Sequence, residues 1–90
     1  MDISVKPRPV AGFDLESLED ELVIYHPVSE AIFYCNPSAA LIFRLCDGTR
    51  SVAEITRLLA QAYPEAEARM ADDVRETLER LVAHGALTCS

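Results

Sequence analysis

The hydrophobic pattern of this chain changes at Asn36, from alternation before it to helical spacing after it. Residues 21–26 alternate clearly, with two apolar side chains on each face, which predicts a strand. Residues 27–30 have the composition of a turn, and residues 31–35 continue as a further strand. Residues 13–18 alternate weakly. We therefore expect a three-stranded antiparallel sheet in the first part of the chain.

A first short helix is bounded by residues suited to its two ends. Asn36 is a preferred N-cap, and Pro37 fits the first turn, where its missing amide hydrogen has no cost. The apolar residues that follow recur at helical spacing. Asp47 and Gly48 end the run, because glycine adopts the left-handed C-terminal conformation without a Cβ penalty.

Two further helices are expected after this turn. Ser51 and Glu54 have the spacing of a capping box and open a helix that runs to about residue 62, and Pro64 prevents its continuation. A third helix begins between residues 65 and 71 and ends at residues 84–85. Its apolar residues form one stripe at helical spacing: Met70, Val74, Leu78 and Leu81.

These elements predict an α+β fold, a small winged helix-turn-helix-like domain in which an N-terminal three-stranded antiparallel sheet is followed by three helices. Ninety residues make one domain. We assign it to residues 13–90. Residues 1–12, which contain Pro7 and Pro9 and show no periodicity, are expected to form a flexible, weakly packed arm. Docking of this arm on a sheet edge or on a second copy is an alternative.

The order of residues from Tyr34 to Ile55 resembles the PqqD family of small peptide chaperones, also called RiPP recognition elements. The shared order is Tyr-x-Asn-Pro-x-Ala-Ala-Leu-Ile-x-x-Leu-x-Asp-Gly-x-x-Ser-Val-x-Glu-Ile, with Cys35 in place of the usual leucine. The resemblance extends back to residues 21–25 and forward through residues 71–74 to residues 85–87. It covers about three quarters of the chain and implies peptide binding, without identifying a pathway.

The net charge of −7 and a pI of about 4.6 bear on the choice of partner. An acidic protein repels phosphate, and much of the affinity for DNA comes from neutralising phosphates. On the second helix only Arg57 is placed to reach a phosphate. A winged-helix DNA-binding regulator is therefore the weaker alternative, and a structural or oligomerising module is the third.

No catalytic or metal-binding constellation is present in the sequence. His26 and His84 have no evident partners, and His84 is explained by the negative end of a helix dipole. Asp72 and Asp73 lack a third oxygen ligand at a suitable spacing. No Gly-rich phosphate loop occurs. We therefore predict a non-catalytic protein without metal, nucleotide or other cofactor.

The three cysteines form no Cys-x-x-Cys pair, which is typical of free thiols in a reducing compartment. Cys35 and Cys46 occupy apolar positions of a strand and a helix, whereas Cys89 lies in the tail. No apolar run reaches the length of a membrane helix, and no signal peptide follows Met1. The expected location is the cytoplasm, without membrane association.

A three-stranded sheet leaves two edges, and an extended peptide can add to such an edge. The resemblance implies that the leader of a ribosomally made precursor adds to residues 31–35 and packs against the third helix. The expected peptide-binding residues are Ile32, Phe33, Tyr34, Cys35, Asp73, Thr77, Arg80 and Leu81. On the helix, the opposite flank remains open as a choice: Arg75, Glu79 and Val82.

The resemblance also implies a second partner, a modifying enzyme that receives the peptide and is often a radical SAM enzyme. The product class, whether a quinone cofactor such as PQQ, a lasso peptide or another modified peptide, is left open by the sequence. A homodimer formed through the exposed sheet edge is possible on the same grounds.

Overall fold

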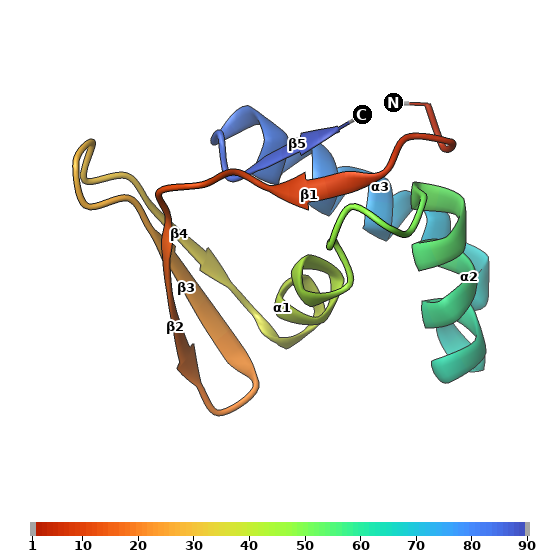
Figure 1. Ribbon diagram of the computed structural model, residues 1–90. Coiled ribbons are helices and arrows are strands. Elements are labelled where there is room, and N and C mark those ends of the chain that lie inside the picture. The colour runs from red at the N-terminus through yellow and green to blue at the C-terminus, as the bar shows by residue number, and fades with distance from the viewer. Residues whose placement is uncertain (1, 90) are drawn as a thin grey trace.

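The computed structural model describes residues 2–89 as an α+β domain in which the helices lie on one side of a three-stranded sheet (Figure 1). Antiparallel strands precede three α-helices, as the sequence predicts, and a short strand follows them. The elements are β1 (Pro7–Pro9), β2 (Asp14–Leu18), β3 (Glu21–Tyr25), β4 (Ile32–Cys35), α1 (Pro37–Arg44), α2 (Val52–Ala62), the 3-10 turn η1 (Pro64–Ala66), α3 (Glu67–Ala83) and β5 (Leu87–Cys89).

The main sheet has the order β2-β3-β4, so that β2 and β4 are its edges. Its register pairs Val23 with Tyr34 and Ile24 with Phe33. Because successive side chains of a strand point to opposite faces, the sheet has two chemically different faces. The inner face carries Leu22, Ile24, Phe33 and Cys35, all buried against the helices.

The N-terminal segment is attached to both the C-terminal strand and α2. β1 pairs antiparallel with β5, and the two strands lie side by side across the top of Figure 1. The carbonyl oxygens of Ile3 and Val5 accept hydrogen bonds of 3.0 Å from the amides of Ala53 and Val52, at the start of α2. These contacts satisfy two of the amides that a helix N-terminus leaves without intrahelical partners.

The sequence predicts weak packing throughout residues 1–12, and the structure differs at Pro7, whose side chain is fully buried. The sequence pattern does not predict β1 or β5. The two strands are three residues long, and prolines at both ends of β1 remove the usual strand signal. The flexibility of residues 1–12 in solution and the domain boundary after residue 12 stay predictions.

Helix α1 begins as predicted and ends earlier than predicted. The Asn36 side chain accepts a 2.9 Å hydrogen bond from the amide of Ala39. The helix closes at Arg44, with a right-handed cap at Leu45. Gly48 has φ +84°, the left-handed conformation that the sequence predicts, but it lies in the following turn. The short polar bonds of that turn end the helix before the glycine is reached.

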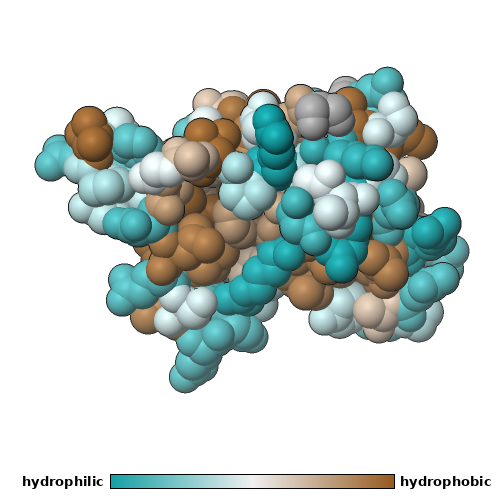
Figure 2. Space-filling view, in the orientation of Figure 1, coloured by the Kyte–Doolittle hydropathy of each residue, from teal (hydrophilic) through white to brown (hydrophobic). Residues whose placement is uncertain are grey.

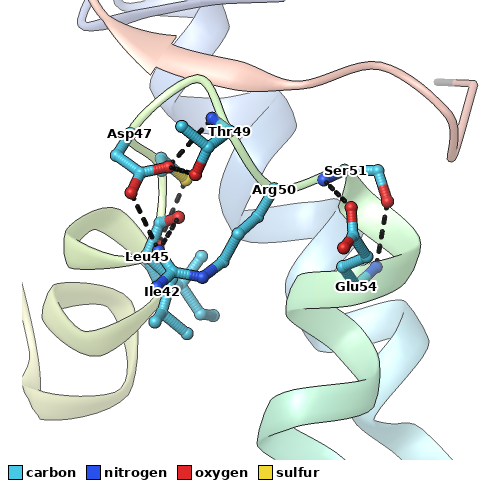
Figure 3. Close-up of polar contacts among 8 residues, drawn as sticks. Ile42, Leu45, Asp47, Thr49, Arg50, Ser51 and Glu54 are labelled. Carbon is cyan, nitrogen blue, oxygen red and sulfur yellow. Dashed lines mark hydrogen bonds and ion pairs between the residues drawn. The ribbon is translucent and has the colours of Figure 1, made fainter.

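Asp47 organises the turn between α1 and α2 (Figure 3). Its carboxylate accepts hydrogen bonds from the amide and the hydroxyl of Thr49, at 2.9 and 2.6 Å, and pairs with Arg50 at 3.0 Å. The Thr49 bonds hold the pKa of the Asp47 carboxyl below its usual value. The turn therefore has its own local network, which fixes the direction in which α2 starts.

The predicted capping box of α2 is confirmed. The Ser51 hydroxyl accepts from the amide of Glu54 at 3.1 Å, and the Glu54 carboxylate accepts from the amide of Ser51 at 2.9 Å (Figure 3). Helix α3 lies within the predicted limits, and its predicted apolar stripe is buried. The core therefore joins the inner face of the sheet to all three helices.

Candidate functional site

Strand β4 has one edge paired with β3 and one edge free of strand partners among the described residues. His26 donates its amide to the carbonyl of Ala31 at 2.9 Å, which marks these opposed residues as a hydrogen-bonded pair. Hydrogen-bonded and non-hydrogen-bonded pairs alternate along antiparallel strands. The peptide groups of Ile32 and Tyr34 therefore face the free edge, whereas those of Phe33 face β3.

The side chains of β4 alternate between two environments. Phe33 and Cys35 are buried, whereas Ile32 and Tyr34 are 66% and 54% exposed. The exposed fraction of Ile32 is high for a branched aliphatic residue. A strand with this alternation offers free backbone groups and apolar side chains together, which is what β-strand addition requires.

Helix α3 covers the inner side of β4 with its final turns. The Arg80 guanidinium lies over the Phe33 ring, 5.5 Å from its centroid, and the His84 ring meets Phe33 edge-on at 4.8 Å. Asp73, Thr77, Arg80 and His84 recur every three or four residues and form one stripe beside the buried stripe of α3. This is the flank that sequence analysis chose. The contacts to Phe33 place its C-terminal part beside β4.

The eight predicted site residues differ in accessibility. Arg80 and Asp73 are exposed and Thr77 is half-buried, so these three side chains are reachable from solvent. Cys35 and Leu81 have no exposed surface and form part of the floor under the strand and helix. Their predicted contact with a peptide stays a prediction, and it would require the floor to open.

Asp73 lies at the other end of the stripe, towards α1. It lines a hollow of about 440 Å³ bounded by α1, the end of α2, η1 and the start of α3, together with Ser38, Leu41 and Tyr63. Its carboxylate is 3.9 Å from Arg69. Seven residues of helix separate Asp73 from Arg80, about 10 Å along the axis, so the stripe extends past the end of β4.

The competing flank of α3 is engaged in its own ion pairs. Arg75 contacts Asp72 at 3.2 Å and Glu79 at 3.7 Å, and Val82 lies partly exposed on the same side. In the described part of the chain, Arg80 has no ion pair of this kind. Arg80 is therefore the cation of α3 that is both next to β4 and free for an incoming carboxylate.

Hydrogen bonding and burial shift the pKa values of two β4 side chains. Tyr34 donates a hydrogen bond from its hydroxyl to the Glu21 carboxylate, and this bond raises the pKa of the phenol. Burial raises the pKa of the Cys35 thiol, while the positive charges of Arg80 and Arg44 oppose the shift. Both groups are therefore neutral at physiological pH.

The described residues contain no group of three or more potential ligands placed to hold a metal ion. Burial raises the pKa of the Cys46 thiol to about 12, far from that of a reactive thiolate. His26 accepts from the amide of Ser29 at 3.1 Å and packs edge-on against Phe13, which gives it a structural role. The arrangement around β4 is that of a binding surface.

His84 is a candidate site residue that the sequence does not single out. The sequence explains it by the negative end of the helix dipole, and its Nδ1 is 2.9 Å from the carbonyl oxygen of Arg80. Its packing on Phe33 adds a second role. The available signal was the spacing of four residues from Arg80, which puts both on one face of α3.

The fold is that of a class of small domains in which an antiparallel sheet is followed by three helices. TbiB1, solved in complex with the TbiA(beta) leader peptide, has a similar fold and matches with a TM-score of 0.77. The match covers 89% of this chain and 93% of that chain, at 19% sequence identity. At this identity the similarity shows the fold.

The family itself is shown by sequence. Residues 21–87 match the family model described as Coenzyme PQQ synthesis protein D (PqqD), and the chain therefore belongs to the PqqD family. A PqqA binding protein of Klebsiella pneumoniae (strain 342) is 36% identical over 74 residues, 82% of this chain and 77% of that protein. A PqqA binding protein of Pseudomonas entomophila (strain L48) is 38% identical over 72 residues, 80% and 76% of the two chains.

Proposed function

We propose that this protein is a non-catalytic peptide chaperone that binds the leader of a ribosomally synthesised precursor and presents the precursor to a modifying enzyme. The observation that carries the proposal is the β4 edge, where Ile32 and Tyr34 direct peptide groups outwards next to Arg80 of α3. Family membership and the names of the PqqA binding relatives support it. So does the leader peptide in the TbiB1 complex.

In this proposal the leader adds as a fourth strand beside β4. Its backbone pairs with the peptide groups of Ile32 and Tyr34, which gives direction and register. Every second leader side chain then points towards α3, where Thr77 and Arg80 supply polar contacts. An acidic leader residue fits this place best, because Arg80 carries a charge without an ion-pair partner among residues 2–89.

The fold does not identify the receiving enzyme. On the basis of the family resemblance we propose a radical SAM enzyme. We also propose that the protein is located in the cytoplasm. In residues 2–89 no helix has the length and hydropathy needed to cross a membrane. No observation favours the DNA-binding alternative: the cations of α2 are limited to the exposed Arg57, and the chain is acidic.

The test is leader binding followed by amide chemical shifts and titration calorimetry. The probes are synthetic PqqA and the leader of any precursor encoded beside this chain. We expect shifts in β4 and in the C-terminal turns of α3. Tyr34→Pro removes an amide donor at the free edge and should abolish binding, whereas Phe33→Pro removes a bond to β3 and should damage the fold as well.

Arg80→Glu gives the side-chain test. It should weaken binding of an acidic leader by about 1–3 kcal/mol, because the added strand shields the pair from water. Arg57→Glu makes the same charge change on α2 and is the matched control. Equal losses of affinity in the two variants would indicate a general charge effect. Amide chemical-shift changes confined to α2 would mean that the leader binds to a different face from the one proposed.

A further inference from the structure

The outer face of the β2-β3-β4 sheet has no covering element among the described residues. The helices lie on the opposite side of the sheet (Figure 1). Register and side-chain alternation place Val23, Tyr25, Ile32 and Tyr34 together on the outer face. They form its apolar centre. A shallow hollow of about 500 Å³ over this face is lined by Val23, Tyr25 and Ile32.

Acidic side chains from β2 border this apolar centre. Asp14 and Glu16 line the same hollow, opposite Tyr25 and Val23 in the register. The wider charge distribution has the same sign, since residues 14–35 contain six Asp or Glu and no Lys or Arg. The rest of the chain contains nine acidic and eight basic residues. The net charge is therefore concentrated on the sheet.

This charge distribution selects among possible occupants of the outer face. Anionic lipid headgroups and nucleic acid are repelled by it. A second copy of this chain would bring its acidic border, which includes Asp14 and Glu16, against the same acidic border, and this opposes dimerisation through the same face. A protein surface with an aliphatic or aromatic centre and Lys or Arg around it matches both the apolar patch and its border.

The outer face is also continuous with the leader site. Residues directly opposite one another in a sheet point to the same face, so leader residues placed opposite Ile32 and Tyr34 would extend the outer face by one strand. A protein docked there would touch β4 and the leader at once. It would therefore distinguish the loaded from the empty sheet.

We propose that the outer face of the β2-β3-β4 sheet docks a basic surface of the modifying enzyme, and that a leader bound to β4 completes this docking surface. The inference rests on the proposed function and adds the location and chemistry of the second interface. It requires that Asp14 and Glu16 act on enzyme binding without acting on leader binding, because β2 is three strand positions away from the leader, roughly 14 Å.

The experiment compares two isosteric double variants. Asp14→Asn with Glu16→Gln removes two charges from the outer face, and Asp72→Asn with Glu79→Gln removes two from the exposed side of α3. The probes are the purified peptide-modifying enzyme encoded nearest to this chain and the synthetic leader of its precursor. Association is followed by surface-immobilised kinetics at low and high salt, with and without leader.

We expect the outer-face variant to bind leader normally and to associate with the enzyme about threefold or more slowly at low salt, with the difference reduced at high salt. The α3 variant should match the unsubstituted protein. Leader should strengthen enzyme binding. Tyr25→Thr, which removes apolar area and leaves both charges, should raise the dissociation rate.

Other outcomes separate the two proposals. If the unsubstituted protein does not bind the leader, the proposed function itself is contradicted. Normal leader binding with equal enzyme kinetics in both double variants would overturn the outer-face inference, as would enzyme binding that is absent or indifferent to the leader. Protection of Asp14 and Glu16 from carboxyl labelling in the ternary complex is the independent readout, and labelling unchanged by the enzyme would count against the inference.

Discussion

The two faces of the β2-β3-β4 sheet are made from the same strands but differ in burial and in chemical character. The inner face presents Leu22, Ile24 and Phe33, which are buried against the helices. The outer face presents Val23 and Tyr25 from the same segment, with carboxylates around them and, within residues 2–89, no covering helix. Figure 2 shows how apolar and hydrophilic surface alternate over the sheet and α1 in this view.

This contrast separates the side of the sheet that stabilises the fold from the side that we propose for docking. The inner face must be dry, because a short chain buries a limited fraction of its surface and depends on each core residue. The outer face contributes little to the core, so its composition is free to serve recognition. The β4 edge lies between the two faces, and a peptide bound there would contribute side chains to both.

The largest expected effect is on the free energy of unfolding, which should respond differently to substitutions on the two faces. Ile24→Ala removes a fully buried side chain and should lower the free energy of unfolding by about 2–5 kcal/mol. Tyr25→Thr, on the next residue and the other face, should change it by about 0.5 kcal/mol or less. Urea unfolding followed by circular dichroism measures both. Similar losses in the two variants would mean that the outer face is packed in solution.

A smaller effect is expected from a site remote from both faces. Ser51→Ala removes the hydroxyl that accepts from the amide of Glu54 and should lower the free energy of unfolding by about 0.5–2 kcal/mol, while leader binding stays unchanged. This variant is the control for effects that act on leader binding through stability alone. If it weakens leader binding as strongly as Arg80→Glu does, the functional reading of Arg80 is wrong.

The same cap has a pH dependence with a defined sign. Hydrogen bonds from the amide and the hydroxyl of Ser51 lower the pKa of Glu54 in the folded protein. This carboxylate therefore contributes stability above its unfolded pKa and loses that contribution as pH falls through the folded pKa. The stability difference between the unsubstituted protein and Ser51→Ala should shrink in part on acidification, as urea midpoints across pH will show.

The smallest expected effect is spectroscopic and reports on the outer face. Tyr34 donates to Glu21, which raises the pKa of its phenol, so Tyr34 should ionise at a higher pH than an ordinary tyrosine. The neutral phenol is the form stabilised by folding, and its contribution is lost as pH rises through the raised pKa. Ultraviolet titration should show Glu21→Gln lowering that pKa. An unchanged titration would show that the bond is not maintained in solution.

Local signals account for most of the helical half. Asn36 and Ser51 begin their helices where sequence analysis placed them, because caps depend on residues within one turn. The alternation of residues 21–26 correctly puts Leu22 and Ile24 on one face and Val23 and Tyr25 on the other, whereas the pattern of residues 31–35 predicts a strand without saying which half of it is buried. The stop at Gly48 was misplaced by a few residues, because the polar bonds of Asp47 compete with the last turn of the helix.

The site was predictable in outline only. The strand and the flank of α3 were chosen from the resemblance and from helical spacing, and the structure places Arg80 of that flank over Phe33. The burial of Leu81 agrees with its place in the predicted apolar stripe of α3, although Leu81 was also expected to contact the peptide, whereas the packing of His84 on Phe33 is not predicted by the sequence pattern. Spacing gives the direction of a side chain around its own helix, whereas its accessibility depends on what packs against it.

The periodic elements after residue 20, the N-caps of α1 and α2, the acidic sheet segment and the family can all be predicted from residue order, because each depends on that order or on neighbours within a few residues. The pairing of β1 with β5 across almost the whole chain cannot, nor can the closing of the end of α3 over Phe33 or, within residues 2–89, the open outer face of the sheet. These contacts join residues far apart in sequence. Their formation depends on the shape and packing of the assembled core. A local sequence pattern does not predict that packing.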